Sequence, residues 1–408
     1  MTERLALICD DDGNRVKSWV RDVERALGDG WAVAPVTDTD LAALSKRLAD
    51  ADRNARDGAS AGELEDPNGS LPSGQSVGEA SLVILDFDLT PSAGATVTDD
   101  ARTALRNQKG EILARQLRAH TSVGAIIVAN RKFSRTNFDL SLWTWSDGVA
   151  DAYIAGANLR TTALWTGQPA EDQFNPWYWP ALNELLERDE AQEFEGIEDS
   201  TYLFEWLGVS PANLEPEQLD AFAEFPSPVE VQMKDLATSP LGQLHHESHY
   251  SAQTTRAVYR SVLRRWVQRI LVPPQNVLVD LPHIAQRFPL LLDDPSRDDE
   301  WQSLCVKYPD APIPSLLKEA IHQRATRLCG RPIFHIDAIR SILGQAVRKE
   351  GVLPYGFAED VSMFYPAAEL DEFTANVPGP HFRRYVRSLD RRAQDVLYAP
   401  APRRAMSS

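Results

Sequence analysis

In its first 160 residues the chain alternates short apolar runs with segments whose apolar residues recur at helical spacing, and this alternation is the feature that most constrains its fold. The helical spacing is found in residues 14–27, 41–48 and 111–117. The apolar runs have the length of buried strands and cover residues 5–9, 31–36, 82–85, 125–128 and 152–155. Strands that alternate with helices predict parallel βαβ units, so we expect an α/β domain with a doubly wound parallel sheet.

Polar segments interrupt this alternation and help to divide the chain. Residues 58–79 are rich in Gly, Ser, Pro, Asp and Glu, and residues 91–107 are also mostly polar, so both are predicted to be flexible insertions. At roughly 150 residues per domain, 408 residues are enough for two or three domains. We expect the α/β domain over residues 1–160, an acidic, Trp-rich connecting segment over 161–240, and a mainly α-helical region of unknown role over 241–408.

The negative charge is concentrated in one part of the chain. Of the net charge of −17, about −15 falls within residues 161–240, about −6 within the first 160 residues, and about +4 within residues 241–408. Phosphate contacts need local positive charge, so general nucleic-acid binding is not expected. Residues 241–408 are mildly basic and are the one region where DNA binding stays open.

The cysteines and the apolar runs together predict a cytoplasmic protein. Cys9, Cys305 and Cys329 are too far apart for a disulfide scaffold or a paired zinc site, and such sparse cysteines are typical of a reducing compartment. No run approaches the roughly 18 apolar residues of a membrane helix, so no membrane partner is expected. The apolar run at residues 5–9 is too short for a signal peptide.

Aspartates follow two of the predicted strands at the point where each strand ends. Asp10, Asp11 and Asp12 follow the first run, and Asp86 ends the third. If the strand order is 2-1-3-4-5, as in flavodoxin-like sheets, Asp10, Asp11 and Asp86 converge at the carboxyl edge. Carboxylates that share a pocket repel one another, and Mg²⁺, which prefers oxygen ligands, relieves the repulsion. Helix capping is the alternative for the aspartates after the first strand, but it leaves Asp86 unexplained.

These residues resemble the receiver domain of bacterial response regulators. The match consists of Leu-Ile-Cys-Asp10-Asp11, Val-Ile-Leu-Asp86, the glycine of Lys109-Gly110-Glu111, and the apolar run at 125–128, and it covers about residues 4–160. The resemblance implies Mg²⁺ held by Asp10, Asp11 and Asp86. It also implies that Asp86 accepts a phosphoryl group from a sensor histidine kinase or another phosphorelay protein. The output then passes through protein partners of the C-terminal region.

Three more positions can be compared with receivers. Two of them differ from the receiver pattern, and one agrees with it. Receivers place Thr or Ser at the end of the fourth strand, where this chain has Asn130 after Ala129. They place Lys at the end of the fifth strand, where the alignment gives Gly156. Tyr153 occupies the position of a mobile aromatic residue. The departures leave open a pseudo-receiver adaptor that binds proteins without a phosphoryl group, an architecture associated with bacterial defence or stress signalling.

A third interpretation is an enzyme. Asp86-Phe-Asp88-Leu-Thr90 fits the DxDxT signature of haloacid-dehalogenase-like phosphatases, which implies Asp86 as nucleophile and Asp88 as general acid. Those enzymes usually carry the signature on their first strand, whereas here a complete βαβ unit precedes it.

Two further clusters have weaker signals. His245 and His249 have the spacing of a metal pair on one helix face, but no third ligand is identifiable, so a solvated polar segment is the simpler interpretation. The arginines of the helix predicted over 254–271 could contact nucleic acid, but most charged stripes simply face water.

Overall fold

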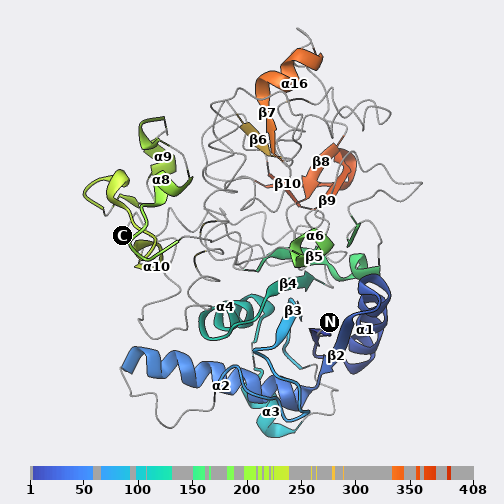
Figure 1. The fold of residues 1–408 in the computed structure, drawn as a ribbon. Helices are drawn as coiled ribbons and strands as arrows, with labels where there is room; N and C mark the ends of the chain where they lie inside the picture. The colour runs from blue at the N-terminus through green and yellow to red at the C-terminus, as the bar shows by residue number, and fades with distance from the viewer. Residues whose placement is uncertain are drawn as a thin grey trace. The chain divides into compact units, whose positions relative to one another are not determined.

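The structure, a computed structural model of the chain, describes residues 3–57, 66–91, 98–106, 108–130 and 150–160, and shorter stretches between 165 and 386 (Figure 1). The chain divides into two compact units. The described residues up to 160 belong to the first unit, together with Tyr259, and the other described residues from 165 onward belong to the second.

A five-stranded parallel sheet forms the first unit. Its strands are β1 (Arg4–Cys9), β2 (Trp31–Val36), β3 (Ala80–Asp86), β4 (Ala125–Asn130) and β5 (Ala152–Ala155). They lie in the order β2-β1-β3-β4-β5, and every neighbouring pair is parallel. This order confirms the predicted doubly wound, flavodoxin-like sheet. It places the carboxyl ends of β1 and β3 side by side, since Cys9 pairs with Leu85.

Helices cover both faces of this sheet, which is why its strands are nearly continuous apolar runs. The helices of the first unit are α1 (Gly13–Leu27), α2 (Asp38–Asp57), α3 (Asp99–Ala104), α4 (Gly110–His120) and the 3₁₀ turn η1 (Gly156–Arg160). α1 packs with η1, whereas α2 packs with α3 and α4. Figure 1 shows α2 and α4 on one side of the sheet and α1 on the other. Leu7, Ile84 and Ile127 are among the core residues that no solvent reaches appreciably.

Both segments predicted as flexible insertions contain folded residues. Within 66–79, Leu71 and Val77 are buried. The Asn68 side chain accepts a hydrogen bond from the Ser122 backbone N–H over 2.8 Å. Within 91–107, residues 99–104 form α3. These residues are part of the folded unit, because their polar side chains bond to the domain while a few apolar ones enter its core.

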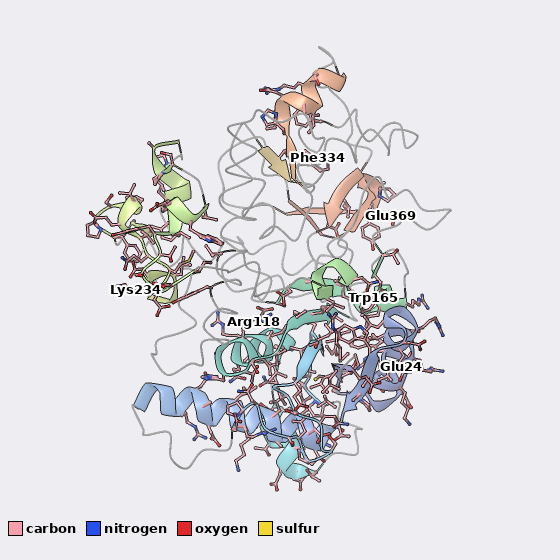
Figure 2. The ribbon with its side chains drawn as sticks, viewed as in Figure 1. Glu24, Arg118, Trp165, Lys234, Phe334 and Glu369 are labelled. Atoms are coloured by element: carbon pink, nitrogen blue, oxygen red, sulfur yellow. The ribbon has the colours of Figure 1, made fainter. Side chains whose placement is uncertain are left out.

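A buried ion pair ties α4 to the amino-terminal edge of the sheet. Arg118, labelled in Figure 2, donates from Nη2 to Oδ2 of Asp151 over 2.5 Å, and the two side chains are 1% and 2% exposed. The same Asp151 oxygen accepts the Ile126 backbone N–H over 2.8 Å. Arg118 Nη1 donates to the Gly124 carbonyl, also over 2.8 Å. The pair thus connects the end of α4 to the starts of β4 and β5, opposite the aspartate edge.

The second unit is described in shorter pieces. Its elements are α6 (Leu182–Glu187), α8 (Leu203–Leu207), η2 (Pro211–Asn213), α9 (Pro216–Leu219), η4 (Pro228–Glu230), α10 (Asp235–Thr238), β6 (Leu278–Asp280), β7 (Ile333–His335), α16 (Ile336–Leu343), β8 (Tyr355–Ala358), β9 (Met363–Pro366), η10 (Ala367–Glu369), β10 (Asp371–Phe373) and β11 (Arg384–Val386). β6 pairs with β7, and a second sheet has the order β10-β11-β8-β9.

These elements do not confirm a mainly helical region after residue 240. The described residues there form more strand than helix, because segments such as Tyr355–Ala358 and Met363–Pro366 pair as an antiparallel hairpin. The histidine cluster around His245 lies outside the described residues. So does most of the helix predicted over 254–271. Within the described residues, no helix is long and apolar enough to cross a membrane.

Candidate functional site

The strand order brings three aspartates together at the carboxyl edge of the sheet. Asp10 and Asp11 directly follow β1, and Asp86 is the last residue of β3. All three are buried, with exposed fractions of 1%, 5% and 0%. One carboxylate oxygen of each lies within 4.8 Å of the others. We call these three residues the acidic cluster.

Asp12 has a different role from its two predecessors. Its Oδ1 accepts the backbone N–H groups of Asn14 over 2.9 Å and Arg15 over 3.3 Å, so it caps the amino terminus of α1. Its own N–H donates to Asp10 Oδ1 over 2.9 Å. Helix capping therefore accounts for Asp12 alone, and Asp10 and Asp11 remain available to the acidic cluster.

Arg15, which sequence reasoning did not single out, inserts its guanidinium among these carboxylates. Its Nε contacts Asp10 Oδ2, and its Nη2 contacts Asp10 Oδ1 at 2.5 Å and Asp11 Oδ1 at 2.8 Å. The same Nη2 lies 3.9 Å from Asp86 Oδ2. The side chain is 21% exposed, so these contacts are largely shielded from water. One internal cation thus faces three carboxylates.

A sequence signal for Arg15 did exist. It lies in the first turn of α1, where the helix dipole disfavours a positive charge. It also follows Asp10 and Asp11 by only five and four residues, so these aspartates are close to it along the chain. A cation in an unfavourable helix position needs a compensating partner, and the preceding aspartates supply it.

Burial and charge shift the ionisation of the acidic cluster in opposing directions. Burial raises the pKa of Asp10 to about 6, although the hydrogen bond and charge of Arg15 lower it. Burial alone lowers the pKa of Arg15, but hydrogen bonding and attraction to Asp10, with the charges of Asp86 and Asp11, raise it above its usual range. Arg15 is therefore charged at any physiological pH. It offsets only part of the repulsion among the carboxylates.

The start of α4 closes one side of the acidic cluster. Gly110 donates its N–H to the Phe87 carbonyl over 3.0 Å, and a Cβ at this glycine would lie only 2.3 Å from the Asp86 carbonyl oxygen. Only glycine permits this close approach. Beside it, Lys109 Nζ pairs with Asp88 Oδ1 at 3.1 Å.

The other receiver positions lie on the neighbouring strands. Ala129 pairs with Asp86, and Asn130 is the next residue along β4, where it pairs with Ala155. Tyr153 pairs with Val128 on β5. The side chains of Asn130 and Tyr153 lie outside the described residues, so only their positions in the sheet are established.

Gly156, at the position where receivers carry lysine, leaves no room for a side chain. A Cβ there would lie 2.7 Å from Cζ2 of the Trp19 indole, and Trp19 is itself buried. The tryptophan on α1 thus occupies the space that a side chain at this position would need. Any side chain at position 156 would require the indole to move.

Gly156→Ala is accordingly expected to destabilise the first unit by about 1–3 kcal/mol, since the buried indole must shift. The matched control is Gly13→Ala, because a Cβ at Gly13 meets no atom within 4 Å and the position is helical. Hydrogen exchange of α1 peptides measures both. Equal effects of the two substitutions would show that the Trp19 contact imposes no constraint.

The donor set of the acidic cluster suits a hard divalent cation. Carboxylate oxygens are the ligands that Mg²⁺ prefers, and three buried carboxylates with oxygens within 4.8 Å supply them. In chemistry and spacing these residues fit such an ion. In this structure the neutralising charge comes from Arg15.

Comparison with known proteins adds little to this geometry. No family model and no curated protein matches the chain. Among solved structures, the RcsB response regulator of Salmonella typhimurium matches at 14% identity over 65% of this chain and 93% of that one, with a TM-score of 0.21. Its structure is described in terms of conformational dynamism for DNA interaction. Because that TM-score is low, the receiver-like character of the first unit rests on strand order and on the position of the acidic cluster.

Proposed function

We propose that the chain is a receiver-type signalling protein whose first unit accepts a phosphoryl group on Asp86. The observation that carries the proposal is the convergence of Asp10, Asp11 and Asp86 at the carboxyl edge of a parallel sheet with the order 2-1-3-4-5. Ligands of such sheets bind at this edge. The donor we propose is the phosphohistidine of a sensor kinase or of another phosphorelay protein.

In the proposed step an Asp86 carboxylate oxygen attacks the phosphorus atom of the donor. The new oxygen–phosphorus bond forms as the bond between phosphorus and the donor nitrogen breaks, and the nitrogen keeps the electron pair. Asp10, Asp11 and Asp86 would hold Mg²⁺, which supplies positive charge toward the phosphoryl oxygens. The Gly110 backbone keeps the start of α4 against the end of β3 and so fixes the position of Asp86.

A second candidate is the adaptor that binds proteins without a phosphoryl group. Two observations favour it: Arg15 already offsets part of the charge of the acidic cluster, and a side chain at position 156 would collide with Trp19. The phosphatase interpretation is weaker. Asp88, its general acid, is held in an ion pair with Lys109 at 3.1 Å.

Asp86→Asn is expected to abolish phosphorylation of the full chain by acetyl phosphate with Mg²⁺, because an amide oxygen is a poor nucleophile toward phosphorus. Intact mass spectrometry would detect the gain of one phosphoryl group. Asp88→Asn is the matched control, two residues along the chain, and should still be labelled.

Three outcomes distinguish the candidates. Labelling that depends on Asp86 but not on Asp88 supports phosphoryl acceptance. Continuous phosphate release that needs both residues points to the phosphatase. If neither acetyl phosphate nor beryllofluoride produces an Asp86-dependent response, small-donor phosphorylation is excluded and the adaptor becomes the better candidate.

A further inference from the structure

We infer that Arg15 and a divalent cation compete for the same carboxylate oxygens, so that Arg15 is a built-in gate on metal loading of the acidic cluster. The inference rests on the proposed function and goes beyond it. The receiver resemblance assigned the aspartates and gave Arg15 no role.

The guanidinium engages the oxygens that a cation would need. Both carboxylate oxygens of Asp10 and one of Asp11 receive N–H groups of Arg15. A divalent ion at the same oxygens would lie within a few ångströms of the guanidinium in a shielded site, where repulsion between like charges is strong. The two cations therefore exclude one another.

Arg15 also has a place to which it can withdraw. Its Nη1 lies 3.4 Å from Asp12 Oδ2, and the Asp12 side chain is 47% exposed. Rotation of the Arg15 side chain away from Asp10 would keep this partner and gain contact with water. The segment between β1 and α1 thus offers Arg15 an inner set of partners, Asp10 and Asp11, and an outer one, Asp12.

The inner contacts set the affinity for metal. A cation must bind a form in which Arg15 has withdrawn, so the measured affinity falls in proportion to the rarity of that form. The guanidinium makes charge-assisted hydrogen bonds to both Asp10 and Asp11, and such bonds are stronger than those between neutral groups. Loss of the guanidinium should therefore tighten metal binding by about tenfold or more.

The test is calorimetric titration of the full chain with Mg²⁺. Arg15→Gln is expected to lower the Kd by at least about tenfold. The matched control is Lys17→Gln, which removes one positive charge from the exposed face of the same helix and should leave the Kd within about twofold, since long-range charge is screened. Arg15→Lys keeps the positive charge but lacks the planar guanidinium. Its Kd for Mg²⁺ should lie between that of Arg15→Gln and that of the parent protein.

Each result has a distinct consequence. An unchanged or weaker affinity in Arg15→Gln, with Mg²⁺ bound by the parent protein, overturns the gate and leaves phosphoryl acceptance standing. Absence of Mg²⁺ binding in all variants overturns both proposals. If Arg15→Gln does not fold without metal, the comparison of Arg15→Lys with the parent protein decides the question, and equal Kd values there refute the competition.

Discussion

Asp151→Ala is expected to destabilise the first unit by about 3–5 kcal/mol, because it leaves the guanidinium of Arg118 buried without its carboxylate. Arg118 keeps the carbonyl acceptors of Val123 and Gly124, which carry no charge. The Ile126 backbone N–H at the start of β4 loses its acceptor at the same time. A buried donor without a partner adds about 1–3 kcal/mol of its own, so the lower end of the range is conservative.

Hydrogen exchange of β4 and β5 peptides is the appropriate measurement, since a chain with two compact units has no single unfolding midpoint. Asp22→Ala is the control: it removes the carboxylate of a pair whose arginine is exposed, Arg25 with Asp22 at 3.7 Å, and should change stability by less than about 1 kcal/mol. If the β4 amides are as well protected from hydrogen exchange in Asp151→Ala as in Asp22→Ala, the buried pair contributes no more to stability than a surface pair.

The sheet could be predicted because each of its strands can be recognised from a short run of consecutive residues. Strands covered on both faces must be apolar along their whole length, so the runs at 5–9 and 82–85 are visible without any tertiary information. The acidic cluster could also be predicted, since strand ends in a parallel sheet share an edge. Asp10, Asp11 and Asp86 follow from strand order alone.

The apolar and helical patterns do not show every contact around the acidic cluster, whether it joins distant residues or close ones. The sequence around Gly156 does not indicate that the Trp19 indole fills the space beside this glycine. Arg15 is read from its position as one more charge on the exposed start of a helix, whereas its guanidinium turns inward. Composition also does not show that residues 66–79, a Gly- and Ser-rich sequence, bond to α2 and to the segment between α4 and β4.

Arg15→Met without divalent cations is expected to destabilise the first unit by about 3 kcal/mol at pH 8, the lower end of the range for buried pairs because the side chain is one-fifth exposed. Methionine keeps much of the packing but none of the charge. The three carboxylates of the acidic cluster are then left to repel one another. Hydrogen exchange of β1 and β3 peptides, corrected for intrinsic exchange rates, measures the loss.

The pH dependence of the stability lost in Arg15→Met distinguishes the contribution of the Arg15 charge from that of its packing. Folding raises the pKa of Asp10 from 3.8 to about 6, so the stability that it contributes is fully present below about 3.8 and is lost as the pH rises through about 6. Arg15 is one of the influences that lower this pKa. In Arg15→Met the pKa rises further, and at pH 5 Asp10 is protonated and the repulsion is relieved.

The deficit of Arg15→Met should therefore be large at pH 8 and much smaller at pH 5. Lys17→Met on the exposed face of the same helix should show almost no deficit at either pH, because its charge faces water. A deficit in Arg15→Met that is equal at both pH values would mean that the arginine acts through its packing. A deficit that grows on acidification would contradict the electrostatic account, since protonation can only weaken repulsion among carboxylates.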